Sequence, residues 1–206
     1  MDSLLTVTTP ASGATAFDLT TLGDVKADLG ITGVSEDAVL TRYVTESSAQ
    51  LARACDRVFA QETVSEQFRL DEPKRVLILK RRPAAVVSIN EDDDLALGIS
   101  DWEMDGNAGL LYRLRDDQRL VWTALKIVVV YQAGYALPSA GPKDLQKAAR
   151  TLAKAQWLAK GRDPLVRSES VPGVYEVAYW VGALPGGAAW PAEIESAIAT
   201  YRNIPV

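Results

Sequence analysis

The feature that most constrains the fold is a change of hydrophobic period along the chain. Apolar residues first recur at helical spacing, with Leu40, Val44, Leu51, Cys55 and Val58 separated by 4, 7, 4 and 3 positions. Residues 61–133 then alternate with period two, and helical spacing returns after residue 141. The chain is therefore predicted to be α+β, a small helical bundle with an antiparallel β unit inserted between its second and third main helices.

The domain organisation follows from the same pattern. We expect a flexible N-terminal arm over residues 1–17, rich in Ser and Thr, and a single domain over residues 18–206. The helical core is expected at residues 20–60, 142–160 and 191–202, the β insertion at 61–133, and a strand and loop at 171–190. Within these, Ser35 is predicted to cap a helix that runs to about Phe59, and Leu120 to Tyr131 to form the strongest strand.

Two scarce residue types exclude many kinds of chemistry. The chain has no histidine, which excludes Ser-His-Asp and Cys-His nucleophile systems and imidazole metal sites. Its single cysteine excludes an intramolecular disulfide and a multi-thiolate metal site, so we expect Cys55 to be a buried, inert thiol. Neither glycine-rich phosphate-loop motif occurs. No catalytic, cofactor or metal site is predicted, although a metal-dependent carboxylate hydrolase stays a formal alternative.

Charge is concentrated in two short segments of a chain whose net charge is −5. The run Glu91, Asp92, Asp93 and Asp94 lacks the spacing of a calcium loop, so a solvated loop tip is favoured over a cation site. The basic group comprises Lys74, Arg75, Lys80, Arg81 and Arg82. Acidic neighbours on both sides favour neutralisation, either within the β unit or against another subunit, over DNA binding. Glycines and prolines interrupt the longest uncharged stretch, and no membrane segment is expected.

Six segments of the chain together resemble one family. They are residues 19–31, 35–59, 79–89, 127–157, 168–180 and 190–205, of which 127–157 is the most specific through its order of Val-Tyr-Gln-Ala-Gly-Tyr, proline and helix. These segments are similar to the head–tail connector (adaptor) proteins of tailed bacteriophages. The alanine-rich third helix and the long Gly/Pro linker at 182–189 depart from the family pattern.

The resemblance implies a virion structural protein without catalysis. Such adaptors form a ring, commonly twelvefold, between the portal protein and a stopper or tail terminator, and double-stranded DNA passes through it unbound. It implies a place in the virion neck after synthesis in the host bacterial cytoplasm. A stopper or tail-completion protein of the same neck is the alternative.

The resemblance also suggests roles for particular residues. Contact with the portal is assigned to the C-terminal residues Tyr201, Arg202, Asn203, Ile204 and Val206. Glu91 to Asp94 are expected to face the channel or the tail side, where like charge would keep DNA from being held. Arg75, Arg81 and Arg82 are expected on one side of an interface between subunits.

Overall fold

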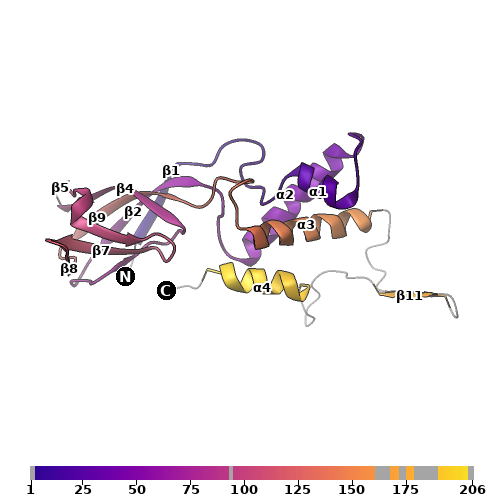
Figure 1. Cartoon of the computed structure of the whole chain (residues 1–206). Coiled ribbons are helices and arrows are strands. Elements are labelled where there is room, and N and C mark those ends of the chain that lie inside the picture. Colours follow the sequence, from indigo (N-terminus) through magenta and orange to yellow (C-terminus); the bar gives the residue numbers. More distant parts are fainter. Residues whose placement is uncertain (1–2, 93–94, 161–167, 172–174, 179–189, 204–206) are drawn as a thin grey trace. The chain divides into compact units, whose positions relative to one another are not determined.

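The chain folds into two compact units, each assembled from two separate stretches. The computed structural model describes residues 3–92, 95–160, 168–171, 175–178 and 190–203 (Figure 1). A β unit comprises residues 1–16 and 58–137, and a helical unit comprises residues 17–57 and 138–206. The predicted α+β class is confirmed, and the single domain expected over residues 18–206 draws on both units.

The larger sheet of the β unit has five strands in the order β1-β2-β9-β4-β5, with each neighbouring pair antiparallel. Its strands are β1 (Ser3–Thr9), β2 (Glu62–Arg69), β9 (Lys126–Ala133), β4 (Ala84–Glu91) and β5 (Leu95–Ala96). A second sheet has the order β3-β7-β6, with β8 paired to β7. Its strands are β3 (Leu77–Ile78), β6 (Trp102–Asp105), β7 (Leu110–Arg115) and β8 (Gln118–Leu120). A short 3-10 helix, η2 (Ile99–Asp101), precedes β6.

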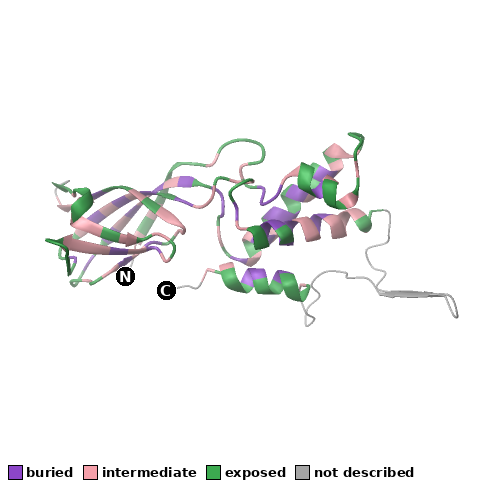
Figure 2. Cartoon of the chain, viewed as in Figure 1, coloured by how far each residue is buried: buried purple, intermediate pink, exposed green. Residues whose placement is uncertain are grey.

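Alternation along the central strands places one hydrophobic core between the two sheets. In β9 every second residue is buried, beginning with Ile127 and ending with Ala133, and β2 alternates in the same way (Figure 2). The register pairs Val64 with Tyr131 and Phe68 with Ile127, so the apolar residues of both strands share a face. Leu77, Leu111 and Trp122 belong to the same buried cluster from the second sheet or its flanks.

The strand predicted from Leu120 to Tyr131 is interrupted. Strand β9 begins only at Lys126, and Leu120 ends β8 instead. Between them Trp122 forms an isolated bridge with Lys74 and is fully buried, whereas Val121 is 43% and Leu125 70% exposed. The prediction of one long strand was wrong because alternating β-type residues do not reveal that the chain changes its pairing partner.

The N-terminal segment is also more ordered than expected. The sequence predicts a flexible arm over residues 1–17, but Ser3 to Thr9 form β1 and pair with β2 in antiparallel register. The β-prone residues of this segment gain their hydrogen bonds from a strand more than fifty residues away. Local composition therefore could not show the pairing.

The helical unit contains α1 (Leu22–Leu29), α2 (Asp37–Ala54), α3 (Lys143–Leu158) and α4 (Ala192–Tyr201). Helix α1 has well-defined ends, because the Thr21 hydroxyl accepts a hydrogen bond from the Asp24 amide and Gly30 is left-handed at φ 69°. Val25, Leu40, Val44 and Ala153 form a buried cluster that joins α1, α2 and α3. The unit also holds a two-stranded hairpin, β10 (Ser168–Val171) and β11 (Tyr175–Ala178).

Helix α2 is shorter than the sequence predicts. It begins at Asp37, without a side-chain cap, and ends at Ala54 rather than near Phe59. Asp56 is left-handed at φ 49°, its amide bonds the Arg53 carbonyl, and the Arg57 amide bonds the Ala52 carbonyl. This is a Schellman stop with aspartate where glycine is usual, so the helical period of the apolar residues continues past the true end.

Candidate functional site

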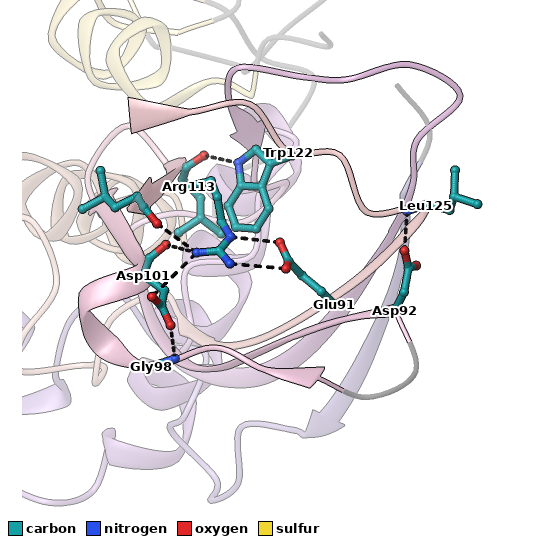
Figure 3. A network of polar contacts seen from close by, with 9 residues as sticks. Glu91, Asp92, Gly98, Asp101, Arg113, Trp122 and Leu125 are labelled. Atoms are coloured by element: carbon teal, nitrogen blue, oxygen red, sulfur yellow. Dashed lines mark hydrogen bonds and ion pairs between the residues drawn. The ribbon is translucent and has the colours of Figure 1, made fainter. Parts of the chain in front are cut away.

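The acidic segment, residues 91–94, begins at Glu91, which is the last residue of β4. Its carboxylate forms an ion pair with Arg113 of β7, with Nε to Oε1 at 3.0 Å and Nη2 to Oε2 at 3.4 Å (Figure 3). Nη1 of the same guanidinium donates to the carbonyls of Asp101 at 2.8 Å and Leu114 at 2.9 Å. The side chains of Glu91 and Arg113 are 15% and 16% exposed, so the pair is largely shielded from water. Glu91 therefore fastens β4 to β7.

Asp92 also has a structural partner. One carboxylate oxygen accepts from the Leu125 amide at 2.9 Å (Figure 3). The other accepts from the amide of Lys126, the first residue of β9, at 2.6 Å. Asp93 and Asp94 lie outside the described residues. Of the expected channel-facing acids, the first two thus anchor the beginning of the segment to its own unit. A role facing the channel or the tail stays a prediction for the four.

The basic group is partly neutralised inside the β unit, one of the two outcomes that the sequence favours. Arg81 forms an ion pair with Glu62 of β2, and Lys74 forms one with Glu72. Lys74 lowers the pKa of the exposed Glu72 carboxyl by a hydrogen bond and by its charge. Arg82 donates to the Ala108 carbonyl at 3.2 Å. The inter-subunit role of Arg75, Arg81 and Arg82 is not tested by these contacts and stays a prediction.

A buried carboxylate in β2 connects three parts of the β unit, and sequence reasoning missed it. Glu66 is fully buried and accepts from the Tyr131 hydroxyl at 2.7 Å, from the Lys80 amide at 3.1 Å and from the Ser3 hydroxyl. Burial, and then the Glu66 carboxylate, raise the pKa of Tyr131. A signal was present, because strict alternation puts Glu66 on the same face as Val64 and Phe68. An acid at a core-facing position indicates a satisfied buried carboxylate.

Gly134 lies in the segment 127–157, and the structure explains why a glycine stands there. It has φ +94°, and a Cβ there would lie 2.3 Å from the Ala60 carbonyl oxygen. The Gly134 amide bonds the Pro83 carbonyl at 2.9 Å, and the Tyr135 amide bonds the Phe59 carbonyl at 2.8 Å. A residue without a side chain is therefore needed for the start and the end of the β insertion to meet here.

The C-terminal residues assigned to portal contact begin on the helical unit. The Tyr201 hydroxyl donates to Asp144 at 3.1 Å, and the Asn203 amide donates to the Cys55 carbonyl at 2.8 Å. Arg202 is exposed, and Ile204 and Val206 lie outside the described residues. The Cys55 thiol is fully buried, and burial raises its pKa against the opposing charges of Arg57 and Arg202. Portal contact is not tested by this geometry and stays a prediction.

Little in the described residues is arranged for chemistry. They contain no group of three or more His, Cys, Asp or Glu side chains able to hold a metal ion. One open depression of about 290 Å³ in the β unit is lined by residues of the β1–α1 connection and of the segment after β9. No helix in this part of the chain is long and apolar enough to cross a membrane.

Comparison with known proteins gives matches only among solved structures. No protein-family model matches the sequence, and no curated protein matches it. A chain from "Neck of empty GTA particle computed with C6 symmetry" matches with a TM-score of 0.56 and 18% identity, covering 98% of this chain and 97% of that one. A chain from "Neck of native GTA particle computed with C12 symmetry" matches with a TM-score of 0.53 and 19% identity over the same shares.

The likeness is one of fold. A third match, from "Virion of native gene transfer agent (GTA) particle", has a TM-score of 0.49 and 17% identity. The first two matches extend over both units of the chain, so they concern the combination of a β unit and a helical unit rather than one common motif.

Proposed function

We propose that this chain is a virion structural protein that forms a ring adaptor between portal and tail, through which double-stranded DNA passes. The observation that carries the proposal is the fold similarity to chains from two gene transfer agent necks, which spans 98% of the chain. Those necks were computed with C6 and C12 symmetry, and this supports self-assembly into a closed ring. The proposed place of action is the virion neck.

The chemistry of the described side chains supports a non-enzymatic role. Glu91, Asp92 and Glu66 have partners that fasten strands and loops of the β unit. A stopper or tail-completion protein of the same neck is the second candidate, since it would share the location. An adaptor binds the portal directly, whereas a stopper needs an adaptor-bound portal.

The deciding experiment is electron microscopy of the purified protein mixed with its cognate portal. A ring stacked coaxially on the portal is expected, because an adaptor requires no other component. A monomer in isolation is compatible with this proposal, since the portal can act as the assembly template. Portal particles that stay bare in the mixture but acquire a ring after another neck protein is added would favour the stopper.

DNA passage is proposed to depend on negative charge at the acidic segment. Because Glu91 and Asp92 hold the unit together, the sharper variant is Asp93→Lys with Asp94→Lys, which leaves both anchors intact. Delayed DNA release is expected from particles with this variant. Asp71→Lys with Glu72→Lys makes the same charge change at a different pair of adjacent residues, both of them exposed, and serves as the control. Equal release kinetics in both variants would contradict a channel role.

Portal contact is proposed for the C-terminal residues. Deleting residues 201–206 would also remove the contacts of Tyr201 and Asn203 with the helical unit. Truncation after Asn203, combined with Arg202→Ala, keeps those contacts and removes the other three assigned residues, Arg202, Ile204 and Val206. Loss of portal in a pull-down with folded protein is expected, and full retention would contradict the assignment. The inter-subunit role proposed for Arg75, Arg81 and Arg82 is best tested at exposed Arg75, since Arg81 already pairs with Glu62.

A further inference from the structure

Strand β1 is an edge strand of the larger sheet and lacks the usual features that prevent pairing with another chain. It stands first in the strand order and pairs with β2 on one side only. Its seven residues, Ser3–Thr9, include no charged residue and no proline. Five of the seven are exposed, among them Leu4 at 68% and Val7 at 37%. Native proteins usually protect such an edge with charge, proline or a very short strand, because it invites pairing with another chain.

The other strand edges of the β unit carry the usual protection. Strand β5, at the far end of the same sheet, has only two residues. In the second sheet, β3 has only two residues, β6 contains Glu103 and Asp105, and the three-residue β8 contains Arg119. The lack of protection is therefore specific to β1, and this indicates that β1 is covered when the protein is assembled.

The hairpin β10–β11 in the helical unit lacks a third strand in the described part of the chain. Its strands have four residues each and pair only with one another in the described part of the chain. A two-stranded hairpin is marginally stable in water, whereas three or more strands give a stable sheet. Both of its outer edges therefore offer main-chain donors and acceptors to a further strand.

We propose that the β10–β11 hairpin of one subunit adds to the β1 edge of its neighbour in the ring. Main-chain hydrogen bonds would supply the affinity, as in other cases of strand addition. The contact is head-to-tail, so every subunit in a closed ring offers one hairpin and accepts another, and every β1 edge is covered. This inference rests on the self-assembly proposed above and names the contact that joins the subunits.

Charge at the two partners agrees with the pairing. The eight residues of the hairpin strands include Glu169 and Glu176 and no basic residue. Strand β1 is itself uncharged, and the Lys80 ammonium donates to the Ser3 carbonyl at its beginning. An acidic hairpin therefore approaches an edge strand that carries no like charge of its own.

Disulfide trapping between two distinguishable chains tests the contact. In a Cys55→Ala background, a tagged chain carries Leu4→Cys or Thr6→Cys and an untagged chain carries Glu169→Cys or Glu176→Cys. The control pairs the same hairpin cysteines with Ser100→Cys, an exposed residue of the same unit. At least one β1–hairpin combination is expected to form about tenfold more mixed dimer than the control, since an interface holds the two thiols at high effective concentration. Mixed dimer at the control level in all four combinations would overturn the proposal.

Two further arms separate the alternatives. A chain carrying both cysteines that cross-links only within itself would also overturn the proposal, because the hairpin would then cover its own β1. The mixed cysteine variants are also combined with portal and imaged. Rings that form without a mixed dimer would refute this interface alone. A mixed dimer that forms without rings would count against the proposed function alone. Leu4→Glu with Thr6→Glu changes exposed residues and places like charge against the acidic hairpin, so it is expected to abolish the mixed dimer formed through a cysteine at Val7. Persistence of that dimer would contradict strand addition.

Discussion

Replacing Gly134 by alanine tests why the ends of the β insertion meet where they do. At this position the backbone has φ +94°, and an added Cβ would lie 2.3 Å from the Ala60 oxygen and 2.8 Å from the Phe59 oxygen. No side-chain rotation relieves such an overlap, because both neighbours are main-chain atoms. The two strand ends must therefore separate if the alanine is to fit.

The expected cost has two parts. A residue with a Cβ pays about 1–2 kcal/mol for left-handed backbone geometry. Separation of the strands also weakens the hydrogen bonds from Gly134 to Pro83 at 2.9 Å and from Tyr135 to Phe59 at 2.8 Å. Each contributes about 1 kcal/mol. The free energy of unfolding should therefore fall by about 3–4 kcal/mol.

Gly13→Ala is the matched control, because Gly13 has φ +107° and no atom within 4 Å of the added Cβ. It should cost only the backbone part, about 1–2 kcal/mol. Urea unfolding monitored by tryptophan emission gives both values, and hydrogen exchange at the Tyr135 amide shows whether the strand ends open. A Gly134→Ala variant no less stable than Gly13→Ala would refute the role of the close approach.

Three further predictions concern buried polar and sulfur groups. Arg113→Met leaves the shielded Glu91 carboxylate without its ion-pair partner, so the free energy of unfolding in urea should fall by about 2–4 kcal/mol. Adding Glu91→Leu should restore most of this loss, and no recovery in the double variant would contradict the reasoning. Tyr131→Phe removes the 2.7 Å hydrogen bond to Glu66 and should cost about 1.5–3 kcal/mol. Because the pKa of Tyr131 is raised, the native state keeps a proton that the unfolded chain releases near pH 10, so stability should fall above about pH 10, less steeply in the variant; parallel pH profiles would argue against it. The buried Cys55 thiol, whose pKa burial raises, should react with Ellman's reagent only as the protein unfolds, and rapid reaction of native protein would show that it is accessible.

Sequence patterns predicted those elements whose signals are local. The helices after Pro142 and Pro191 appear where composition and spacing place them, and the ends of α1 rest on two local signals, the Thr21 cap and the Gly30 stop. The alternation of β2 was also visible, although the inward position of Glu66 that follows from it was missed. In each case the residues that determine the element lie within or next to it.

The remaining features depend on partners far away in the sequence. Strand β1 exists because β2 supplies its hydrogen bonds, and Trp122 leaves the strand pattern because Lys74 pairs with it. The end of α2 depends on a left-handed aspartate, Asp56, which a hydrophobic period does not reveal. The acidic segment shows the same limit, since only the fold brings Arg113 to Glu91 and the Leu125 amide to Asp92.

The contact between Phe59 and Tyr135 has a consequence for how the chain folds. The 88 residues from 55 to 142 separate α2 from α3, and closing so long a loop costs chain entropy before the two helices can pair. Once the β unit has formed, the Tyr135 amide holds the two ends of the insertion together at the Phe59 carbonyl. The helices are then joined through residues 55–59 and 135–142, a connection of 13 residues, which lowers the closure cost by about 2 kcal/mol. The folded β insertion thus holds its own two ends together, and we expect the helical unit to fold after it.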